Sequence, residues 1–110
     1  MFSYEVAILS TDGHPIYRCD TDEHINGSTS DVTIEPHVWV GYRAIIQKNV
    51  TVGACSILSA ASTVTRSIPR FSIAQGTPAS SRDASATYCA RNETPGAVED
   101  ARRIYDRYRP

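Results

Sequence analysis

The stretch VTIEPHVWVGYRAIIQKNVTVGACSILSAASTVTRSIP, from Val32 to Pro69, decides the fold of this chain. Aliphatic residues recur in it at every sixth position: Ile34, Val40, Ile46, Val52, Leu58 and Val64. An α-helix places its apolar residues at a period near 3.6, and a single strand places them at a period of two. A six-residue period fits neither and indicates short strands that wind into successive coils. We expect each of these aliphatic side chains to point into a coil.

The position two residues before each of these aliphatics is also restricted. It holds only small or β-branched residues: Val32, Val38, Ala44, Val50, Ser56 and Ser62. Three six-residue units make one triangular coil with one inward aliphatic per flat face. The pattern therefore predicts an all-β chain, a short parallel β-helix of about two to three coils that runs from about Val32 to Ala74.

Four motifs in the repeat region carry a family resemblance. They are VWVG (Val38–Gly41), VTVG (Val50–Gly53), SxVTRSIP (Ser62–Pro69) and GTPA (Gly76–Ala79). In order and spacing they closely resemble the hexapeptide-repeat acyltransferases, most of all sugar and xenobiotic O-acetyltransferases such as galactoside or maltose acetyltransferase. The resemblance covers residues 1–79 and implies a left-handed β-helix. It also implies acetyl-CoA as co-substrate, a hydroxyl acceptor such as a sugar, and a homotrimer with active sites between subunits.

The repeat is interrupted before residue 32 and ends before residue 80. Residues 1–10 read as a strand that leads into the first coil, whereas residues 11–31 contain Gly13, Pro15 and Gly27 and predict a protruding loop within the 1–79 domain. A loop of this length in a small domain is usually functional or disordered. Residues 80–93 are polar without a period and predict a linker.

The C-terminal residues 94–110 predict a helical tail. Thr94 is a suitable N-cap residue and Pro95 suits the first helical position. Four residues then share one face of the expected helix over 95–108: Val98, Ala101, Tyr105 and Tyr108. Because an isolated helix of this length is marginal in water, we expect this face to pack against a coil or a neighbouring subunit.

Composition excludes several classes of function. The chain has 110 residues, a net charge of −1 and mixed acidic and basic residues, so it carries no footprint for nucleic acid or an anionic membrane. No apolar run approaches the ~18 residues of a membrane span, and residues 1–14 lack the features of a signal peptide. The three cysteines match no disulfide framework, which favours reduced thiols in the cytoplasm.

His14 is the candidate catalytic residue. It lies in the phrase TDGHP, which resembles the catalytic segment of the galactoside acetyltransferase group, where a histidine takes the proton from a sugar hydroxyl. A neutral imidazole suits this task because its ordinary pKa lies near 6.5. Asp12 or a backbone carbonyl could orient the ring. The alternative is an ordinary surface histidine in a turn.

Further residues match family positions near the active-site cleft or the CoA groove. Trp39 is expected to point outward, to a ligand or a subunit contact. The resemblance assigns to cofactor binding Trp39, Gly41, Tyr42, Ala60, Thr65, Arg66 and Arg82. Small residues would let the pantetheine arm approach the strands, and arginines would meet its phosphates. The alternative for most of them is an ordinary coil or turn position.

The chain departs from the family pattern in three places. Ser59 and Ala61 stand where members often have glycine, and Arg82 is the remaining basic residue of the segment that meets the nucleotide phosphates. Met1 falls at a place that resembles the middle of a family member, so acceptor-binding residues that lie further upstream have no counterpart. These departures keep open an alternative to the enzyme: a truncated, non-catalytic remnant that serves as an oligomerising scaffold.

A metal-dependent function is the last alternative. Gamma-class carbonic anhydrases share the fold and bind zinc through three histidines. The histidines here are His14, His24 and His37, and they lack the pair spaced five residues apart that would place two ligands at a coil edge. We therefore expect no metal.

Overall fold

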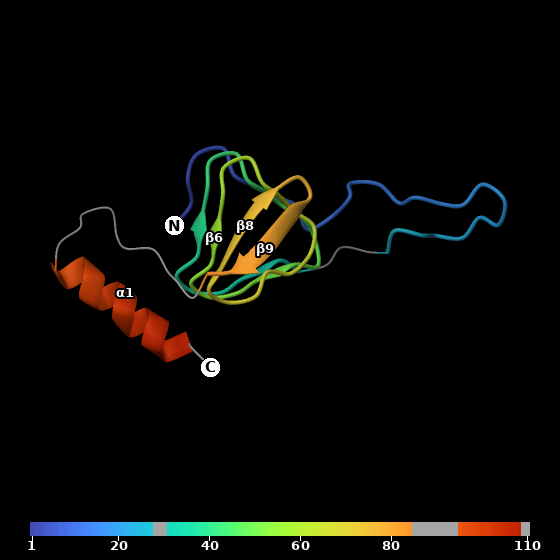
Figure 1. Ribbon diagram of the computed structural model, residues 1–110. Helices are drawn as coiled ribbons and strands as arrows, with labels where there is room; N and C mark the ends of the chain where they lie inside the picture. Colours follow the sequence, from blue (N-terminus) through green and yellow to red (C-terminus); the bar gives the residue numbers. More distant parts are fainter. Residues whose placement is uncertain (28–30, 85–94, 109–110) are drawn as a thin grey trace.

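Short parallel strands wind around a common axis in this computed structural model, which describes residues 1–27, 31–84 and 95–108 (Figure 1). The two-residue strands are β1 (Ala7–Ile8), β2 (Thr33–Ile34), β3 (Trp39–Val40), β4 (Ile45–Ile46), β5 (Thr51–Val52), β6 (Ile57–Leu58) and β7 (Thr63–Val64). Two five-residue strands, β8 (Ser72–Gly76) and β9 (Ala79–Asp83), and one helix, α1 (Pro95–Tyr108), follow. The strands form three sheets, in the orders β1-β4-β7, β2-β5 and β3-β6-β8-β9.

The strand register repeats once per coil. Partners in β2–β5, β3–β6 and β4–β7 are 18 residues apart, which is three six-residue units. The third coil is shorter, because Ile57 pairs with Ile73 and Val52 with Ile68 after only 16 residues. The coils also begin earlier than expected from the repeat. β1 pairs with β4, and Phe2 bridges to Val40, so the first coil starts near the first residue.

The six repeated aliphatics form the core, as predicted. Val40, Ile46, Val52 and Val64 are fully buried, Leu58 is 1% exposed, and Ile34 is half-buried at the edge of the same cluster. The second repeated position also points inward: Val38, Ala44, Val50, Ser56 and Ser62 are all buried. The two inward serines are satisfied by backbone, since Ser56 Oγ donates to the Pro69 carbonyl and Ser62 Oγ to the Ser59 carbonyl, each at 2.7 Å.

Three corners connect the sheets of each coil. The Tyr42 corner contains residues 3–6, 41–44 and 59–62, and the helix corner contains residues 35–38, 53–56 and 69–71. The arm corner is named for the arm, residues 11–27, and contains residues 9–27, 31–32, 47–50 and 65–67. The corners are sharp because non-glycine residues in them adopt left-handed backbone conformations. They are Glu5, Arg43 and Ala61 at the Tyr42 corner, Asn49 at the arm corner, and His37, Cys55 and Phe71 at the helix corner.

The chain closes with an antiparallel hairpin. β8 continues the coil and β9 runs back beside it, with Ser72 opposite Asp83 and Gly76 opposite Ala79. The segment from residue 80 was expected to be a linker, but the structure continues the strand to Asp83. The polar sequence of β9 hid it, because an edge strand exposed to water needs no apolar alternation. Residues 85–94, which include the rest of that linker, Cys89 and the expected Thr94 cap, lie outside the described residues.

The helix packs on the helix corner. Its Ile104, Tyr105 and Tyr108 contact a small cluster of Ala54, Cys55 and Phe71. The rings of Phe71 and Tyr105 lie 4.7 Å apart between centroids. The predicted 95–108 helix is confirmed, but one member of its apolar face is wrong. Val98 is 46% exposed, and Ile104 contributes to the contact instead.

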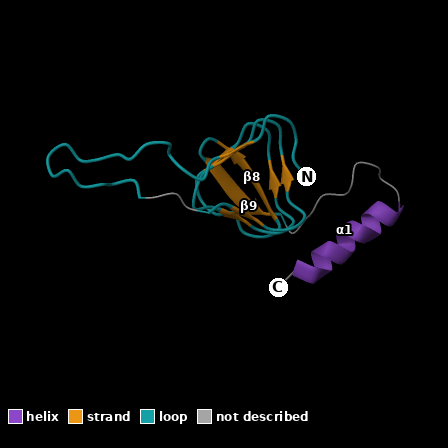
Figure 2. Cartoon of the chain, turned by 180° about the vertical axis from the view of Figure 1, so that it is seen from behind, coloured by secondary structure: helices purple, strands orange, loops and turns teal. Residues whose placement is uncertain are grey.

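The arm, residues 11–27, projects from the opposite side of the coils (Figures 1 and 2). It is an insertion into the first coil, since Ala7 pairs with Ile45 after 38 residues, 20 more than the regular 18. The arm is a hairpin. Tyr17 bridges to His24 in antiparallel fashion, and the Ile25 N–H donates to the Ile16 carbonyl at 2.9 Å. Residues 11–27 of the predicted loop therefore form a hairpin that extends one corner.

Candidate functional site

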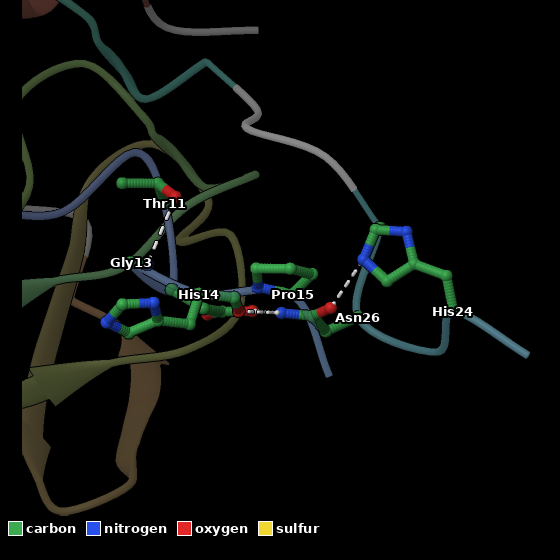
Figure 3. Close-up of a pocket in the computed structure, with 8 residues that line it drawn as sticks. Thr11, Gly13, His14, Pro15, His24 and Asn26 are labelled. Atoms are coloured by element: carbon green, nitrogen blue, oxygen red, sulfur yellow. Dashed lines mark hydrogen bonds between the residues drawn. The ribbon is translucent and has the colours of Figure 1, made fainter. Parts of the chain in front are cut away.

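The neck of the arm, residues 11–15 and 24–27, lines a small cavity. Its volume is about 170 Å³, and its walls come from Thr11, Asp12, Gly13, His14, Pro15, His24, Asn26 and Gly27 (Figure 3). The two chain segments that leave and re-enter the coil thus face each other across the cavity. The His14 ring points back towards the coils, whereas the His24 ring turns towards the neck, where its Nε2 lies 2.7 Å from Asn26 Oδ1. His14 therefore stands at the junction of arm and coil with its side chain exposed.

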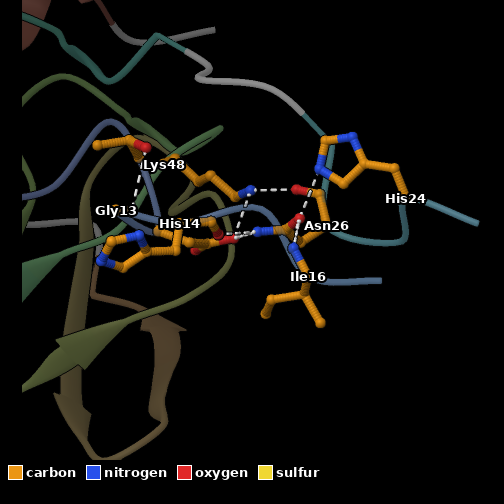
Figure 4. Close-up of polar contacts among 8 residues, drawn as sticks. Gly13, His14, Ile16, His24, Asn26 and Lys48 are labelled. Carbon is orange, nitrogen blue, oxygen red and sulfur yellow. Dashed lines mark hydrogen bonds and ion pairs between the residues drawn. The ribbon is translucent and has the colours of Figure 1, made fainter. Parts of the chain in front are cut away.

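The carboxylate of Asp12 has a different task from the one expected. Its Oδ2 accepts hydrogen bonds from Lys48 Nζ at 2.8 Å and from Asn26 Nδ2 at 2.9 Å. The hydrogen bond from Lys48, and then that from Asn26, lower the pKa of Asp12 below its ordinary value. This oxygen therefore joins the neck to Lys48 of the second coil, and the expectation that Asp12 orients the His14 ring is not supported. Figure 4 shows Lys48 reaching from the coil to Asn26 in the neck.

The other predicted binding residues fall at different places in the same chain. Trp39 leads into the Tyr42 corner, and Gly41, Tyr42 and Ala60 lie within it. Thr65 and Arg66 lie at the arm corner, one coil beyond Lys48, because Ile46 pairs with Val64. His14 shares the arm corner with Thr65 and Arg66. A single chain consequently divides these residues between the arm corner and the region of the Tyr42 corner, while Arg82 lies on β9.

At the Tyr42 corner the phenol ring is tied to the first coil. The Tyr42 hydroxyl donates to Glu5 Oε2 at 3.2 Å, and Arg43 Nε donates to the same oxygen at 2.7 Å. The Arg43 guanidinium also lies 5.2 Å from the centroid of the Tyr42 ring. These contacts hold the aromatic ring in place on an exposed edge.

The packing of the coils requires a glycine at position 41. A Cβ at this position would lie 2.6 Å from the Leu58 carbonyl oxygen and 2.7 Å from the Ala60 nitrogen. Its own N–H donates to the Leu58 carbonyl at 2.8 Å. The next coil therefore requires glycine here whether or not a ligand binds.

An outward row of side chains crosses the β3-β6-β8-β9 sheet. Trp39 pairs with Ile57, Ile57 with Ile73, and Ile73 with Arg82, so the four residues point to the same side. Trp39 is 39% exposed whereas the neighbouring Val40 is fully buried, which confirms the predicted outward direction of the indole. The row joins Trp39 and Arg82, two predicted binding residues, through isoleucines that sequence reasoning did not select.

Sequence reasoning also missed Asn26 and Lys48. Asn26 lies in the loop and Lys48 follows the inward Ile46 by two positions, and no short motif links them. Only the pairing of β1 with β4 brings them together, because it places the neck against the second coil. The only local signal for this contact was Lys48 itself, a cation two residues after a strand. Such cations are common in exposed turns and do not indicate a particular partner.

Two classes of site have no candidate in the described part of the chain. Residues 1–27, 31–84 and 95–108 contain no group of three or more His, Cys, Asp or Glu side chains that could hold a metal ion. Within the same ranges no helix is long and apolar enough to cross a bilayer.

Comparison with known proteins agrees with the geometry. Galactoside O-acetyltransferase of Escherichia coli strain K12 is 36% identical over 72 residues, which make up 64% of this chain and 34% of that protein. The crystal structure of a polysialic acid-specific acetyltransferase superposes with a TM-score of 0.77 and 31% identity, over 93% of this chain and 46% of that one. The chain therefore spans about a third to a half of these relatives.

A third relative was solved with its ligand. It is the hexapeptide-repeat acetyltransferase of Vibrio cholerae O1 biovar eltor, complexed with acetyl coenzyme A. The superposition gives a TM-score of 0.56 and 26% identity, over 71% of this chain and 42% of that one. The chain matches no protein-family model.

Fold and repeats together define a left-handed parallel β-helix protein built from six-residue repeats. The chain is a relative of the hexapeptide-repeat acyltransferases, with galactoside and polysialic acid O-acetyltransferases among its matches.

Proposed function

We propose that the chain provides the catalytic β-helix of an acetyl-CoA-dependent O-acetyltransferase that acts on a sugar hydroxyl. The observation that carries the proposal is the position of His14, which lines the neck cavity where the arm leaves the coil. Relatives whose names specify galactoside and polysialic acid O-acetylation support a sugar as the acceptor.

The proposed active site lies between subunits of a homotrimer. One chain has His14 at the arm corner and Trp39 and Tyr42 at or next to the Tyr42 corner, on the far side of the β1-β4-β7 sheet. If the arm of one copy extends over the next copy, the two halves meet. The outward row of Trp39, Ile57 and Ile73 offers an apolar strip for such a contact.

His14 acts as the general base in this proposal. The neutral ring takes the proton of the acceptor hydroxyl, and the freed oxygen attacks the carbonyl of the acetyl thioester. Backbone N–H groups of the coils would stabilise the negative charge that develops on that carbonyl oxygen. When the carbon–sulfur bond breaks, the proton held by His14 passes to the departing thiolate. Acetyl-CoA supplies the activated acetyl group.

The residues present suit a coenzyme A ligand. Ala60 is exposed and has no bulk beyond its methyl group, so an extended chain can approach the backbone at this corner. Arg66 and Arg82 are exposed cations that can meet phosphates. The Vibrio cholerae relative with bound acetyl coenzyme A supports the same co-substrate.

A thioester-cleavage assay over a panel of sugars tests the proposal, with wild type beside His14→Ala. The expected result is transfer to at least one sugar, lowered by roughly 10²- to 10⁴-fold in the variant, since this is the usual contribution of a general base. Equal rates would reject His14 as the base.

Calorimetric titration with acetyl-CoA addresses the scaffold alternative. Ser59 and Ala61, which replace glycines of the family pattern, are the observation that favours it. A wild-type protein that neither binds acetyl-CoA nor turns over any sugar would reject the enzyme and favour the scaffold.

A further inference from the structure

The side chain of Asn26 joins the two segments of the arm's neck. Its Nδ2 donates to Oδ2 of Asp12 and to the carbonyl oxygen of His14, each at 2.9 Å. Its Oδ1 accepts from the backbone N–H of Ile16 at 2.8 Å and lies 2.7 Å from Nε2 of His24. A carboxamide has two N–H donors and one oxygen with two lone pairs. All four capacities are used inside the arm, so Asn26 has none left for a ligand.

These bonds fix the backbone on both sides of His14. The Gly13 N–H donates to Thr11 Oγ1 at 3.1 Å before it, and the Ile16 N–H is bound to Asn26 after it. Pro15 further restricts the residue before it to extended conformations. The imidazole can still rotate about its own side-chain bonds, but the backbone that carries it is held by Asn26 (Figure 3).

The neck is also tied to the second coil through one side chain. Lys48 Nζ donates to Asp12 Oδ2 at 2.8 Å and to the Asn26 carbonyl oxygen at 2.6 Å (Figure 4). Lys48 lies two residues after the fully buried Ile46, so its backbone belongs to the rigid part of the coil. Asp12, Asn26 and Lys48 therefore form a latch between the arm and the coil.

We infer that Asn26 is a positioning residue for His14, which it holds at a fixed place above the arm corner through the latch. The inference rests on the proposed function, in which His14 takes the acceptor proton. A general base must stay within hydrogen-bond reach of the hydroxyl. A displacement of about 1 Å, even one caused far from the reacting atoms, can lower a rate by about 10²-fold.

Amide hydrogen exchange followed by NMR tests the latch without any need for turnover. Asn26→Ala removes the acceptor of the Ile16 N–H, so we expect this amide to exchange at least about 10-fold faster. The Gln47 N–H, bonded to the Val64 carbonyl at 3.0 Å inside the coils, should keep its rate. An unchanged rate at Ile16 would overturn the inference. Equal acceleration of both amides would also overturn it, because the effect would then be a general loss of stability.

Kinetics test the positioning role with a variant of nearly the same shape. Asn26→Asp keeps the oxygen but removes both N–H donors and places a second carboxylate beside Asp12. We expect kcat to fall by about 10- to 10²-fold while KM for acetyl-CoA changes less than about twofold, since the co-substrate lies on the coils. The matched control is Asn49→Asp, which adds the same charge next to Lys48 but outside the neck and should change kcat less than about twofold.

A double variant supplies the rescue. Asn26→Asp combined with Asp12→Asn exchanges the two side chains, restores a donor and an acceptor between them, and leaves one carboxylate near Lys48. Partial recovery of kcat supports the inference, because the exchanged pair still lacks the donor to the His14 carbonyl oxygen. Wild-type kcat in the single Asn26→Asp variant overturns it. A wild-type protein without turnover, in which Asn26→Ala still frees the Ile16 amide, would reject the proposed function and leave Asn26 as the residue that fixes the His14 backbone.

Discussion

Arg70 holds Glu35 in a two-point ion pair across the helix corner. Its Nε lies 3.0 Å from Glu35 Oε1, and its Nη2 lies 3.0 Å from Glu35 Oε2. The Ala54 N–H donates to Glu35 Oε1 at 3.0 Å, and the Arg70 guanidinium lies 5.3 Å from the centroid of the Tyr108 ring. The Glu35 carboxylate thus joins three coils, and Arg70 links them to the helix. Paired guanidinium–carboxylate contacts of this geometry are among the stronger polar contacts at a protein surface.

Stability should therefore fall on acidification in a way that depends on Glu35. The hydrogen bond from Arg70, and then that from the Ala54 N–H, lower the pKa of Glu35 in the folded chain. A lowered pKa stabilises the fold above the ordinary glutamate pKa of about 4.3, and this effect is lost as the pH falls through the lower folded value. Thermal unfolding of Glu35→Gln at pH 7 and pH 3 should show a smaller difference in Tm than wild type. Glu99→Gln, on an exposed part of α1, should leave the wild-type difference intact.

A charge in the centre of the coils should prevent folding. Ile46 is fully buried between Ile8 and Val64 of the neighbouring coils, and Ile46→Asp would leave a carboxylate there without a partner. We expect a loss of several kcal/mol in the free energy of unfolding, measured by urea denaturation. Ile46→Val should cost only about 1 kcal/mol, and Gln47→Asp on the exposed side still less. A soluble, cooperatively folded Ile46→Asp protein would contradict the register.

Ala61 offers a stabilising substitution. Its φ is 60°, and an L-residue with a Cβ pays roughly 1–2 kcal/mol for this conformation. Ala61→Gly should therefore raise the free energy of unfolding by about 1 kcal/mol, after the added freedom of glycine in the unfolded chain is subtracted. Ala60→Gly is the matched control next to it, because Ala60 does not have a positive φ and should only lose stability. Destabilisation by both changes would argue against strain at Ala61.

Oligomerisation should depend on the outward row that starts at Trp39. We expect light scattering to report a mass near three chains for wild type at micromolar concentration. Trp39→Asp would place a charge in the apolar strip with Ile57 and Ile73 and should dissociate the assembly, whereas Trp39→Phe should retain it. A wild-type monomer would remove both the trimer and the active site between subunits.

The two candidate roles at the arm corner should separate in kinetics. His14→Ala should lower kcat and leave the affinity for CoA nearly unchanged, because the base acts on the acceptor proton. Arg66→Ala should raise KM for acetyl-CoA and leave kcat closer to wild type, because a phosphate contact is made equally in ground state and transition state. Steady-state rates with acetyl-CoA varied at a saturating acceptor would distinguish the two. The same profile for both variants would contradict this division.

The core of the coils could be predicted from the sequence because the repeat is a local signal. Each of Val40, Ile46 and Val52 follows the previous one by six residues, and this spacing alone decides which side chains point inward. β9 could not be predicted in this way. Ser80 and Ser81 are exposed on an edge strand, so nothing in their own chemistry indicates pairing with β8.

The candidate site was predictable residue by residue but not as an arrangement. His14 and Trp39 could be selected by resemblance to family motifs, whereas Asn26 and Lys48 have no motif. Their contacts join residues 22 positions apart in the chain, and Asp12 meets Lys48 across 36 positions. Such contacts exist only after the first coil has stacked on the second.

By itself the sequence determined the coiled β-helix, its inward aliphatics and the C-terminal helix. The reason is that periodicity and helix-capping residues act over a few neighbouring positions. Tertiary structure alone decided that the helix packs with Ile104 rather than Val98, that Asp12 binds Lys48, and that His14 and Tyr42 fall at different corners. These outcomes depend on which distant segments the stacking of coils brings into contact, and no local pattern specifies that.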